Sequence, residues 1–293
     1  MISRRESVRR IVDALTGLYV RQEAEAIARA VITDKEGITM SHLLAFPDEE
    51  CGLNADELDK ITAELASGRP LQFVLGHCDF CELDFEVGEG VLIPRPETEE
   101  LVAAVLKRCE DGDSVLDLCT GSGCIAIALA DRLKNSQVTA VDISEKALGY
   151  ARKNASKNGV NIEFIQADIL QESDFNTIRR LPGLKVGRAD SKFDVIVSNP
   201  PYVPLADKPS MHKNVVDFEP YEALFVPDDD PLLFYKRIAT AGREILREGC
   251  LLAFEIYESY SARIAEMLSE AGYRDIEIID DANLKPRIVC CRK

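Results

Sequence analysis

A doubly wound α/β fold with a mostly parallel sheet is the fold class predicted for this chain of 293 residues. From about residue 110 onward, short apolar runs alternate with longer segments of helical period, which is typical of a parallel sheet with crossover helices. One apolar run leads directly into a glycine-rich turn, as strands of nucleotide-binding sheets do. Residues up to about 70 lack strand alternation, so a separate helical domain is expected before the sheet.

The helical N-terminal domain is predicted to span residues 1–75. Its best-defined helix begins after Asn54, which has the capping-box spacing to Glu57, and ends near Gly68. Between these signals, apolar residues recur at helical spacing. We expect this domain to contact the substrate.

A short β-hairpin is predicted within a linker at residues 76–95. Residues 80–87 alternate loosely between apolar and polar side chains and are followed by two glycines. Pro96 then opens a helix whose acidic first turn suits the helix dipole. The sheet domain is therefore predicted to occupy residues 96–293.

The predicted strand at residues 115–118 is followed by Cys119–Gly123, which we call the glycine turn, and then by an apolar helix. Gly121 and Gly123 permit close backbone approach to a ligand, and the helix N-terminus offers unpaired N–H groups. Asp142 ends the next strand, about twenty residues on, where a carboxylate can accept both ribose hydroxyls. This spacing favours an adenosine-type cofactor, although the G-x-G-x-x-A pattern that starts at Gly121 keeps NAD as an alternative.

Two further carboxylates lie on or after predicted strands near this turn. Asp117 stands just before the turn and has no evident apolar role. Asp168 follows the strand at residues 162–166, where it could accept a hydrogen bond from an adenine amine. An ordinary strand-terminating aspartate explains Asp168 equally well, so both interpretations stay open.

The segment Asn199–Tyr202, which we call the clamp, reads Asn-Pro-Pro-Tyr and follows an apolar strand at residues 193–198. Its two prolines have no N–H, so the carbonyls of this turn can face a ligand without competing donors. A planar NH₂ group could donate one hydrogen to the Asn199 side-chain oxygen and the other to the Pro200 carbonyl. Tyr202 adds a flat face for packing. The clamp therefore indicates recognition of a planar nitrogen.

The rest of the chain continues the alternation of helix and strand. A helix is expected around residues 232–246 and a strand at residues 251–256. Apolar stretches at residues 276–279 and 288–291 predict an antiparallel terminal hairpin. The loop at residues 206–230 is long for a compact α/β unit and follows the clamp directly, so we interpret it as a segment that covers the substrate.

These motifs resemble those of class I S-adenosylmethionine-dependent methyltransferases and, within that class, the release factor glutamine methyltransferases. The resemblance covers nearly the whole chain and is carried by Asp117–Gly123, Asp142, the clamp and the segment Leu92–Glu99. It implies a seven-stranded sheet and methyl transfer to the glutamine of a Gly-Gly-Gln motif in peptide chain release factors. The glutamine amide nitrogen would attack the sulfonium methyl group directly, so no covalent enzyme intermediate is expected.

The resemblance also implies roles for individual residues. Asn199 and Pro200 are expected to be catalytic, because they would hold the plane of the amide. The expected glutamine-binding residues are Asn199, Pro200, Pro201 and Tyr202. The expected cofactor-binding residues are Asp117, Cys119, Thr120, Gly121, Ser122, Gly123, Asp142, Asp168, Ile169 and Asn199. Arg95 and Thr98 are further candidates for contact with the cofactor or the substrate.

Two positions depart from the family pattern. Cys119 stands where many members carry glycine, which tightens the first position of the turn. Ile169 stands where some relatives place tryptophan beside adenine, and its side chain could still form an apolar wall.

Other functions fit parts of the sequence. A ribosomal-protein glutamine methyltransferase would use the same clamp, and so would an enzyme that methylates the exocyclic amine of adenine or guanine. An NAD-dependent oxidoreductase would explain the glycine turn but would leave the clamp without a role. A non-catalytic binding module would explain the helical domain but would leave the glycine turn without a ligand.

Composition narrows these choices. The net charge of −16 disfavours a broad phosphate-binding surface, so stable nucleic-acid binding is not expected. The 9 cysteines, with no apolar signal segment at the N-terminus, fit reduced thiols in the cytoplasm, and no membrane association is expected. Cys78 and Cys81 have the spacing of a metal knuckle, but no second ligand pair follows at suitable spacing, so no metal is expected.

Overall fold

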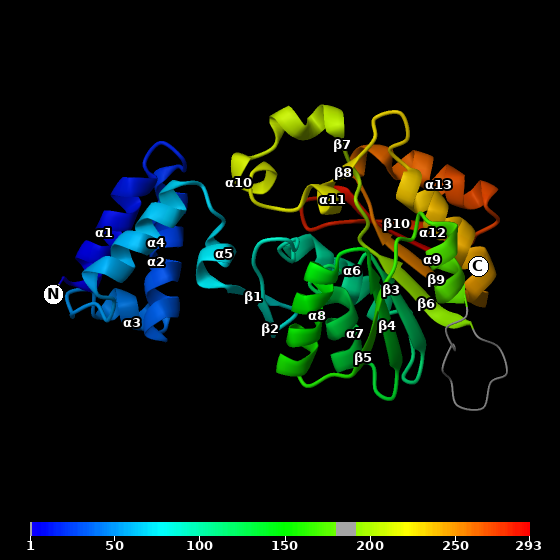
Figure 1. Ribbon diagram of the computed structural model, residues 1–293, viewed down its shortest axis with the longest axis horizontal. Coiled ribbons are helices and arrows are strands. Elements are labelled where there is room, and N and C mark those ends of the chain that lie inside the picture. Colours follow the sequence, from blue (N-terminus) through cyan, green and yellow to red (C-terminus); the bar gives the residue numbers. More distant parts are fainter. Residues whose placement is uncertain (1, 180–191) are drawn as a thin grey trace. The chain divides into compact units, whose positions relative to one another are not determined.

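A computed structural model describes residues 2–179 and 192–293, which form two compact units (Figure 1). The first unit comprises the residues up to His77 together with His212–Phe218, and the second comprises Cys78–Met211 and Glu219–Lys293. The sequence does not predict that His212–Phe218 belongs to the first unit. A Cβ atom on Gly68 would lie 3.9 Å from a ring carbon of Phe218. The aromatic side chain of Phe218 therefore packs near Gly68 of the first unit.

The first unit is helical. Its buried apolar residues recur at helical spacing, so that one face of each longer helix is buried in a common core that includes Ile11, Leu15, Val31 and Leu58. The helices are α1 (Arg4–Leu15), α2 (Arg21–Glu36), α3 (Met40–Ala45), α4 (Ala55–Ala66), α5 (Leu71–Leu75) and α10 (Lys213–Val216).

The capping box predicted at the start of α4 is confirmed. The Glu57 backbone N–H donates to Asn54 Oδ1 at 3.0 Å, and the Asn54 N–H donates to Glu57 Oε2 at 3.1 Å. These reciprocal bonds satisfy two donors that the helix itself leaves without partners. The helix ends at Ala66, two positions before the predicted stop at Gly68.

The second unit contains the predicted sheet, and its seven strands have the order β10-β11-β9-β6-β3-β4-β5. The strands are β3 (Ser114–Leu118), β4 (Gln137–Asp142), β5 (Ile162–Gln166), β6 (Phe193–Ser198), β9 (Leu246–Glu255), β10 (Arg274–Asp280) and β11 (Pro286–Arg292). Pairs among β5, β4, β3, β6 and β9 are parallel, whereas β11 is antiparallel to both β9 and β10. The doubly wound, mostly parallel sheet and the terminal hairpin are thus confirmed.

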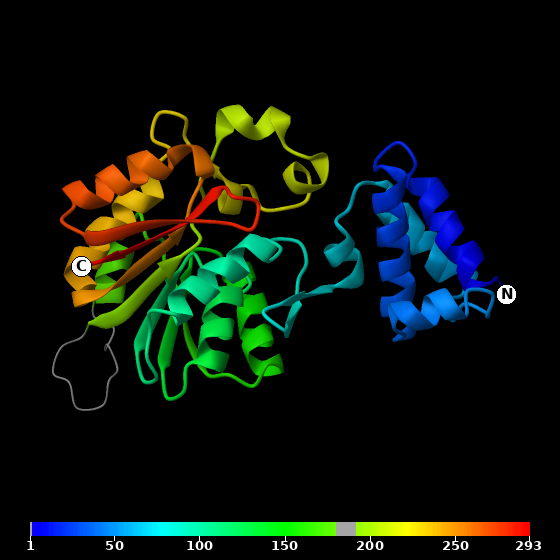
Figure 2. The same cartoon turned by 180° about the vertical axis from the view of Figure 1, so that it is seen from behind.

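Helices cover both faces of this sheet (Figures 1 and 2). One layer is formed by α6 (Pro96–Leu106), α7 (Cys124–Arg132) and α8 (Glu145–Lys157), and the other by α9 (Glu172–Arg179), α12 (Leu233–Ile245) and α13 (Ser261–Glu270). Successive strand residues supply the two cores alternately: Val115 packs with the first layer and Leu116 with the second. Both strand faces are therefore buried, which explains the continuous apolar runs in the sequence.

The predicted hairpin is present, with β1 (His77–Phe80) paired with β2 (Leu83–Glu86). The helix that Pro96 was expected to open is α6, with Pro96 in its first turn. In the described part of the chain, none of the helices has the length and apolar character required to cross a membrane.

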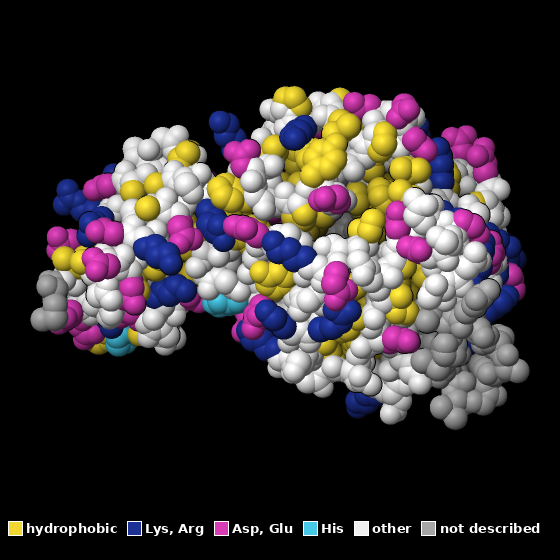
Figure 3. Space-filling view, viewed as in Figure 1, with side chains coloured by type: hydrophobic (Ala, Val, Ile, Leu, Met, Phe, Trp, Pro, Cys, Tyr) yellow, Lys and Arg dark blue, Asp and Glu magenta, His cyan; other side chains and the backbone are white. Residues whose placement is uncertain are grey.

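The segment after the clamp has more structure than a plain loop. The short strand β7 (Val203–Pro204) pairs in parallel with β8 (Phe225–Val226), which brings the two ends of the segment together. Between them lie the 3₁₀ helix η1 (Leu205–Ser210), α10 of the first unit, and α11 (Tyr221–Leu224). Figure 3 shows hydrophobic side chains gathered around β7, β8 and α11.

The strand order indicates where in the sheet the predicted site lies. The chain runs from β3 to β4 and β5 on one side, and from β6 to β9 on the other, so the order reverses between β3 and β6. Ligands bind at such a reversal, beyond the carboxyl ends of the parallel strands. The glycine turn follows β3 and the clamp follows β6, and the register pairs Leu118 with Ser198. The two motifs therefore lie beside each other at this edge.

Candidate active site

The glycine turn has an unusual backbone. Cys119, Gly121 and Gly123 all have positive φ, at 62°, 57° and 82°. A Cβ atom on Gly123 would lie 3.0 Å from both Ala151 Cβ and Ile127 Cδ1, closer than an ordinary contact, so a side chain there would force the packing between α7 and α8 to shift. A Cβ atom on Gly121 would meet no atom within 4 Å apart from those of its two chain neighbours. Gly121 therefore leaves the backbone open to a ligand.

Asp142, at the end of β4, orients this turn. Its Oδ2 accepts a hydrogen bond from the Gly121 N–H at 2.8 Å, and its Oδ1 accepts one from the Ser144 N–H at 2.9 Å. Burial raises the pKa of Asp142, and these backbone bonds oppose that shift. Each carboxylate oxygen has a second lone pair for a ligand hydroxyl.

The next residue, Ile143, has 55% of its surface exposed, and sequence reasoning did not single it out.

Three other predicted cofactor residues, one at the end of β3 and two in the glycine turn, are buried. Asp117, Thr120 and Ser122 are only 0%, 4% and 2% exposed. Thr120 donates to Asp117 Oδ2 at 2.6 Å, and the Ser122 carbonyl accepts from Asn154 Nδ2 at 3.0 Å. Burial raises the pKa of Asp117 to about 7, against the opposing effect of the Thr120 hydrogen bond. These side chains support the turn, and their contact with a cofactor stays a prediction.

Asp168 and Ile169 follow β5 at the same edge. Asp168 Oδ1 accepts a hydrogen bond from the Leu170 N–H at 2.9 Å, as in a strand-terminating turn. Ile169 is 6% exposed and packs into the core, and its carbonyl accepts from Arg237 Nε at 2.6 Å. The proposed contacts of these two residues with adenine stay predictions.

The clamp is fixed to the sheet and to a buried carboxylate. Ser198, directly before it, donates through Oγ to the Leu118 carbonyl at 2.6 Å. Asn199 Nδ2 donates to Glu255 Oε2 at 2.9 Å and to Thr98 Oγ1 at 3.3 Å. Because the amide nitrogen is used in this way, Asn199 Oδ1 is the atom left to accept from a ligand.

Glu255 lies at the end of β9 and is 1% exposed. Its Oε2 also accepts from Thr98 Oγ1 at 2.6 Å, and its Oε1 accepts from the Tyr202 hydroxyl at 2.9 Å. Burial raises the pKa of Glu255, while the hydrogen bonds from Thr98 and Tyr202 oppose the shift. Sequence reasoning missed this residue, although a glutamate inside the apolar run Leu251–Ile256 was a visible signal.

The Tyr202 ring is also held by an aromatic contact. It stacks with Tyr257 at a centroid distance of 6.0 Å and an interplanar angle of 29°. The Tyr257 hydroxyl donates to Asp207 Oδ2 of η1 at 2.6 Å. Tyr202 is therefore fixed both through its hydroxyl and through its ring.

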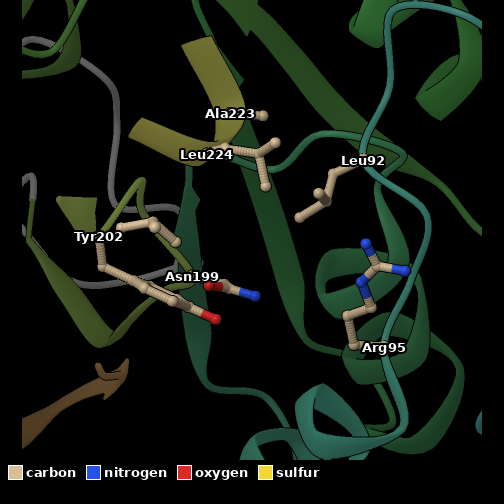
Figure 4. Close-up of a pocket in the computed structure, with 7 residues that line it drawn as sticks. Leu92, Arg95, Asn199, Tyr202, Ala223 and Leu224 are labelled. Atoms are coloured by element: carbon tan, nitrogen blue, oxygen red, sulfur yellow. The ribbon is translucent and has the colours of Figure 1, made fainter. Parts of the chain in front are cut away.

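A pocket opens at the clamp (Figure 4). It is lined by Leu92, Arg95, Asn199, Tyr202, Val203, Ala223 and Leu224. In Figure 4, Asn199 and Tyr202 lie across the pocket from Leu92 and Arg95. A largely apolar lining with a few polar groups is typical of a ligand-binding pocket.

Arg95 reaches this pocket from the segment before α6 and forms an ion pair with Glu219. Glu219 is 6% exposed and also accepts from the Ile93 N–H at 3.3 Å. Burial raises the pKa of Glu219, and the Arg95 guanidinium opposes that shift. Thr98, the other candidate of this segment, is 2% exposed and lies in the network behind Asn199.

The cysteines of the linker have high pKa values. Burial raises the pKa of Cys78 to about 12 and that of Cys81 to about 11, so both thiols are protonated at neutral pH. Within residues 2–179 and 192–293, no group of three or more His, Cys, Asp or Glu side chains is arranged to hold a metal ion.

Comparisons with known proteins agree with this geometry. A family model described as a methyltransferase domain matches residues 109–226. A release factor glutamine methyltransferase of Bacteroides thetaiotaomicron is 39% identical over 97% of this chain and 98% of its own length. The protein of the same name from Flavobacterium psychrophilum is 36% identical over 95% of each chain, and that from Thermodesulfovibrio yellowstonii is 30% identical over 98% of this chain and 97% of its own.

Proposed function

The chain belongs to the release factor glutamine methyltransferase family, and from this premise we propose the reaction that its site performs. It transfers a methyl group from S-adenosylmethionine to the side-chain amide nitrogen, N5, of a glutamine, and the C–S bond breaks to release S-adenosylhomocysteine. That glutamine is the one in the Gly-Gly-Gln motif of peptide chain release factors.

The direction of the Asn199 amide is the observation that supports this proposal most. Its nitrogen is bonded to Glu255 and Thr98, so its oxygen is left to accept a hydrogen from a substrate NH₂ group. The pocket beside it has apolar walls from Leu92, Val203 and Leu224, which suit the aliphatic stem of glutamine. A glutamine carboxamide matches both features.

The residues of the clamp act by positioning. Asn199 Oδ1 and the Pro200 carbonyl each accept one hydrogen of the substrate NH₂, which fixes the plane of the amide and the direction in which its nitrogen attacks. An amide nitrogen is a poor nucleophile because its lone pair is delocalised into the carbonyl group. As methyl transfer places positive charge on this nitrogen, the two oxygen acceptors stabilise that charge, and the nitrogen then loses a proton.

The glycine turn and Asp142 fit an adenosine-type cofactor. Gly121 has open space where a side chain would stand, and Asp142 has lone pairs for ribose hydroxyls at the adjacent strand end. Exposed Ile143 supplies an apolar surface directly after Asp142. When bound, S-adenosylmethionine supplies an electrophilic methyl group, and the roles of Gly121, Asp142 and Asn199 in holding it are part of our proposal.

The helical unit is proposed to recognise the release factor, and the segment after the clamp to cover the bound substrate. Support for recognition by the helical unit comes from its exposed large apolar residues, which include Leu18, Val20, Leu44 and Phe46. For the covering segment, Ala223 and Leu224 line the pocket. A cytoplasmic location follows from the proposed substrate, since release factors act in translation.

The experiment that tests the function offers the purified protein a choice of substrates. It is incubated with S-adenosylmethionine and, in separate reactions, with a release factor, a ribosomal-protein mixture and nucleic acid. Mass spectrometry then locates the added methyl group. Methyl on the glutamine of Gly-Gly-Gln is expected, whereas methyl only on a ribosomal protein or on a base would overturn the proposed substrate.

A further inference from the structure

We infer that Glu255 is a positioning residue for methyl transfer, because its carboxylate fixes the direction of the Asn199 amide. The inference rests on the proposed function and deepens it. Glu255 is not among the residues that line the pocket, so it acts through Asn199 and not on the substrate itself.

Hydrogen-bond chemistry decides the direction of the amide. Glu255 Oε2 accepts from Asn199 Nδ2 at 2.9 Å and from Thr98 Oγ1 at 2.6 Å. An ionised carboxylate only accepts hydrogen bonds, so only the NH₂ edge of Asn199 can face it. The Asn199 oxygen is therefore directed away from Glu255.

Burial raises the pKa of Glu255, but several features oppose that shift and favour the ionised form. Its two oxygens receive hydrogen bonds from Asn199, Thr98 and Tyr202, which offset the cost of burying a charge. The positive charge of Arg287 adds an attraction to the carboxylate. The Tyr235 hydroxyl also donates to the Glu255 carbonyl at 3.1 Å, which holds the backbone of this residue in place.

The opposite direction of the Asn199 amide would block the reaction. A reversed side chain would place its NH₂ group against the NH₂ group of the substrate, so two donors would meet and one acceptor would be lost. Loss of such a hydrogen bond, with one donor left unpaired, corresponds to a decrease of roughly 10- to 100-fold in rate. Glu255 prevents this reversal by accepting a hydrogen bond from the NH₂ group of Asn199.

The arrangement also assigns a role to two other residues of the network. Thr98 accepts from Asn199 and donates to Glu255, so it connects α6 to the clamp. The Tyr202 hydroxyl donates to Glu255 and is thereby fixed. Thr98 therefore supports the Asn199 end of the clamp, and Glu255 also holds its other end through Tyr202.

The first test is Glu255→Gln, which keeps the size of the side chain and removes its charge. We expect kcat to fall roughly 10- to 100-fold, while the KM for release factor changes less than kcat and the calorimetric Kd for S-adenosylmethionine changes less than about threefold. Thermal unfolding is measured in parallel. A folded Glu255→Gln variant with the kcat of the natural protein would overturn the inference.

A double-mutant cycle separates positioning from a general structural role. If Glu255 acts through Asn199, then Glu255→Gln should change kcat by less than about twofold when Asn199 is already replaced by alanine. A loss in that background as large as in the natural protein would contradict the inference. Full activity of Asn199→Ala alone would instead contradict the proposed function, whereas an inactive Asn199→Ala beside a fully active Glu255→Gln would overturn only the role of Glu255.

Thr98 provides a test that leaves Glu255 in place, in case Glu255→Gln does not fold. Thr98→Val keeps the shape of the side chain and removes its hydroxyl, and we expect kcat to fall roughly 3- to 10-fold. The matched variant Thr98→Ser keeps the hydroxyl and should restore kcat to within about twofold. Equal kcat values for the valine and serine variants would contradict the inference.

Discussion

Replacement of Gly121 and Gly123 by alanine should separate ligand binding from packing within the glycine turn. The two residues stand two positions apart, and both have positive φ, at 57° and 82°. Alanine in this backbone region costs about 1–2 kcal/mol, and because alanine lowers the entropy of the unfolded chain, a net cost of about 1 kcal/mol remains. The backbone cost is therefore similar at the two positions. Any difference in stability between the two variants comes from the atoms that surround each glycine.

The surroundings differ in the space available to a Cβ atom. At Gly123 it would lie 3.0 Å from Ala151 Cβ and Ile127 Cδ1, so the packing between α7 and α8 must change. Such overpacking costs about 1–3 kcal/mol. Together with the backbone cost, it should lower the free energy of unfolding of Gly123→Ala by about 2–4 kcal/mol. At Gly121 no atom outside the two adjacent residues would lie within 4 Å of the Cβ atom, so Gly121→Ala should lower the free energy of unfolding by only the backbone cost of about 1 kcal/mol.

Thermal unfolding and calorimetry with S-adenosylmethionine measure the two effects. Gly123→Ala should lower the Tm by roughly 5–15 °C. Gly121→Ala should keep a Tm close to that of the natural protein but bind the cofactor at least about tenfold more weakly, because its methyl group occupies the space beside the backbone. A Gly121→Ala variant with unchanged cofactor affinity would refute the assignment of this turn to the cofactor.

Two further predictions concern carboxylates of the sheet. Asp142→Ala should raise the Kd for S-adenosylmethionine roughly 10- to 100-fold while kcat at saturating cofactor falls less, and unchanged affinity in calorimetry would exclude the ribose role. At the opposite end of β6, burial acts to raise the pKa of Asp194, but hydrogen bonds from Ser114 and the ion pair with Arg247 bring it down to about 2. Since this pKa is below the unfolded value, the carboxylate stabilises the fold by about 2 kcal/mol above pH 4, and this contribution is lost as the pH falls toward 2. Urea unfolding at pH 6 and pH 3 should therefore show a smaller difference between the natural protein and Asp194→Asn at the lower pH, and a constant difference would contradict the shift.

Much of the second unit could be predicted from the sequence because its signals are local. Runs of apolar residues buried on both faces identify β3, β4 and β6, and the sequence places polar residues at the ends of these strands. In a parallel sheet those ends meet at one edge, so the glycine turn and the clamp could be predicted to lie together.

The parts of the site that could not be predicted from the sequence depend on contacts between residues far apart in the chain. Asn199 and Glu255 are 56 positions apart, and Thr98 is 101 positions from Asn199, so no spacing rule connects them. Arg95 and Glu219 are 124 positions apart. A buried glutamate in an apolar strand indicates that a partner exists but does not identify it. Only the folded sheet brings the Glu255 carboxylate against the amide nitrogen of Asn199.

The backbone conformation of the glycine turn shows why Cys119 is an unusual residue at its position. Its φ of 62° lies in the left-handed region, where glycine is favoured. The sequence indicates a departure from the family pattern, but it does not show that the departure requires a strained backbone. Burial raises the pKa of the Cys119 thiol well above its ordinary value, so this side chain is a protonated, unreactive group at neutral pH.

The most direct measurement is the rate of methyl transfer to a release factor by the natural protein and by Asn199→Ala, at saturating S-adenosylmethionine. We expect the natural protein to methylate the glutamine of Gly-Gly-Gln and Asn199→Ala to be about 100- to 1000-fold slower, because a positioned acceptor is lost. The cofactor Kd of the variant should change far less than its rate. Equal rates for the two proteins would contradict the role of the clamp in holding the glutamine amide.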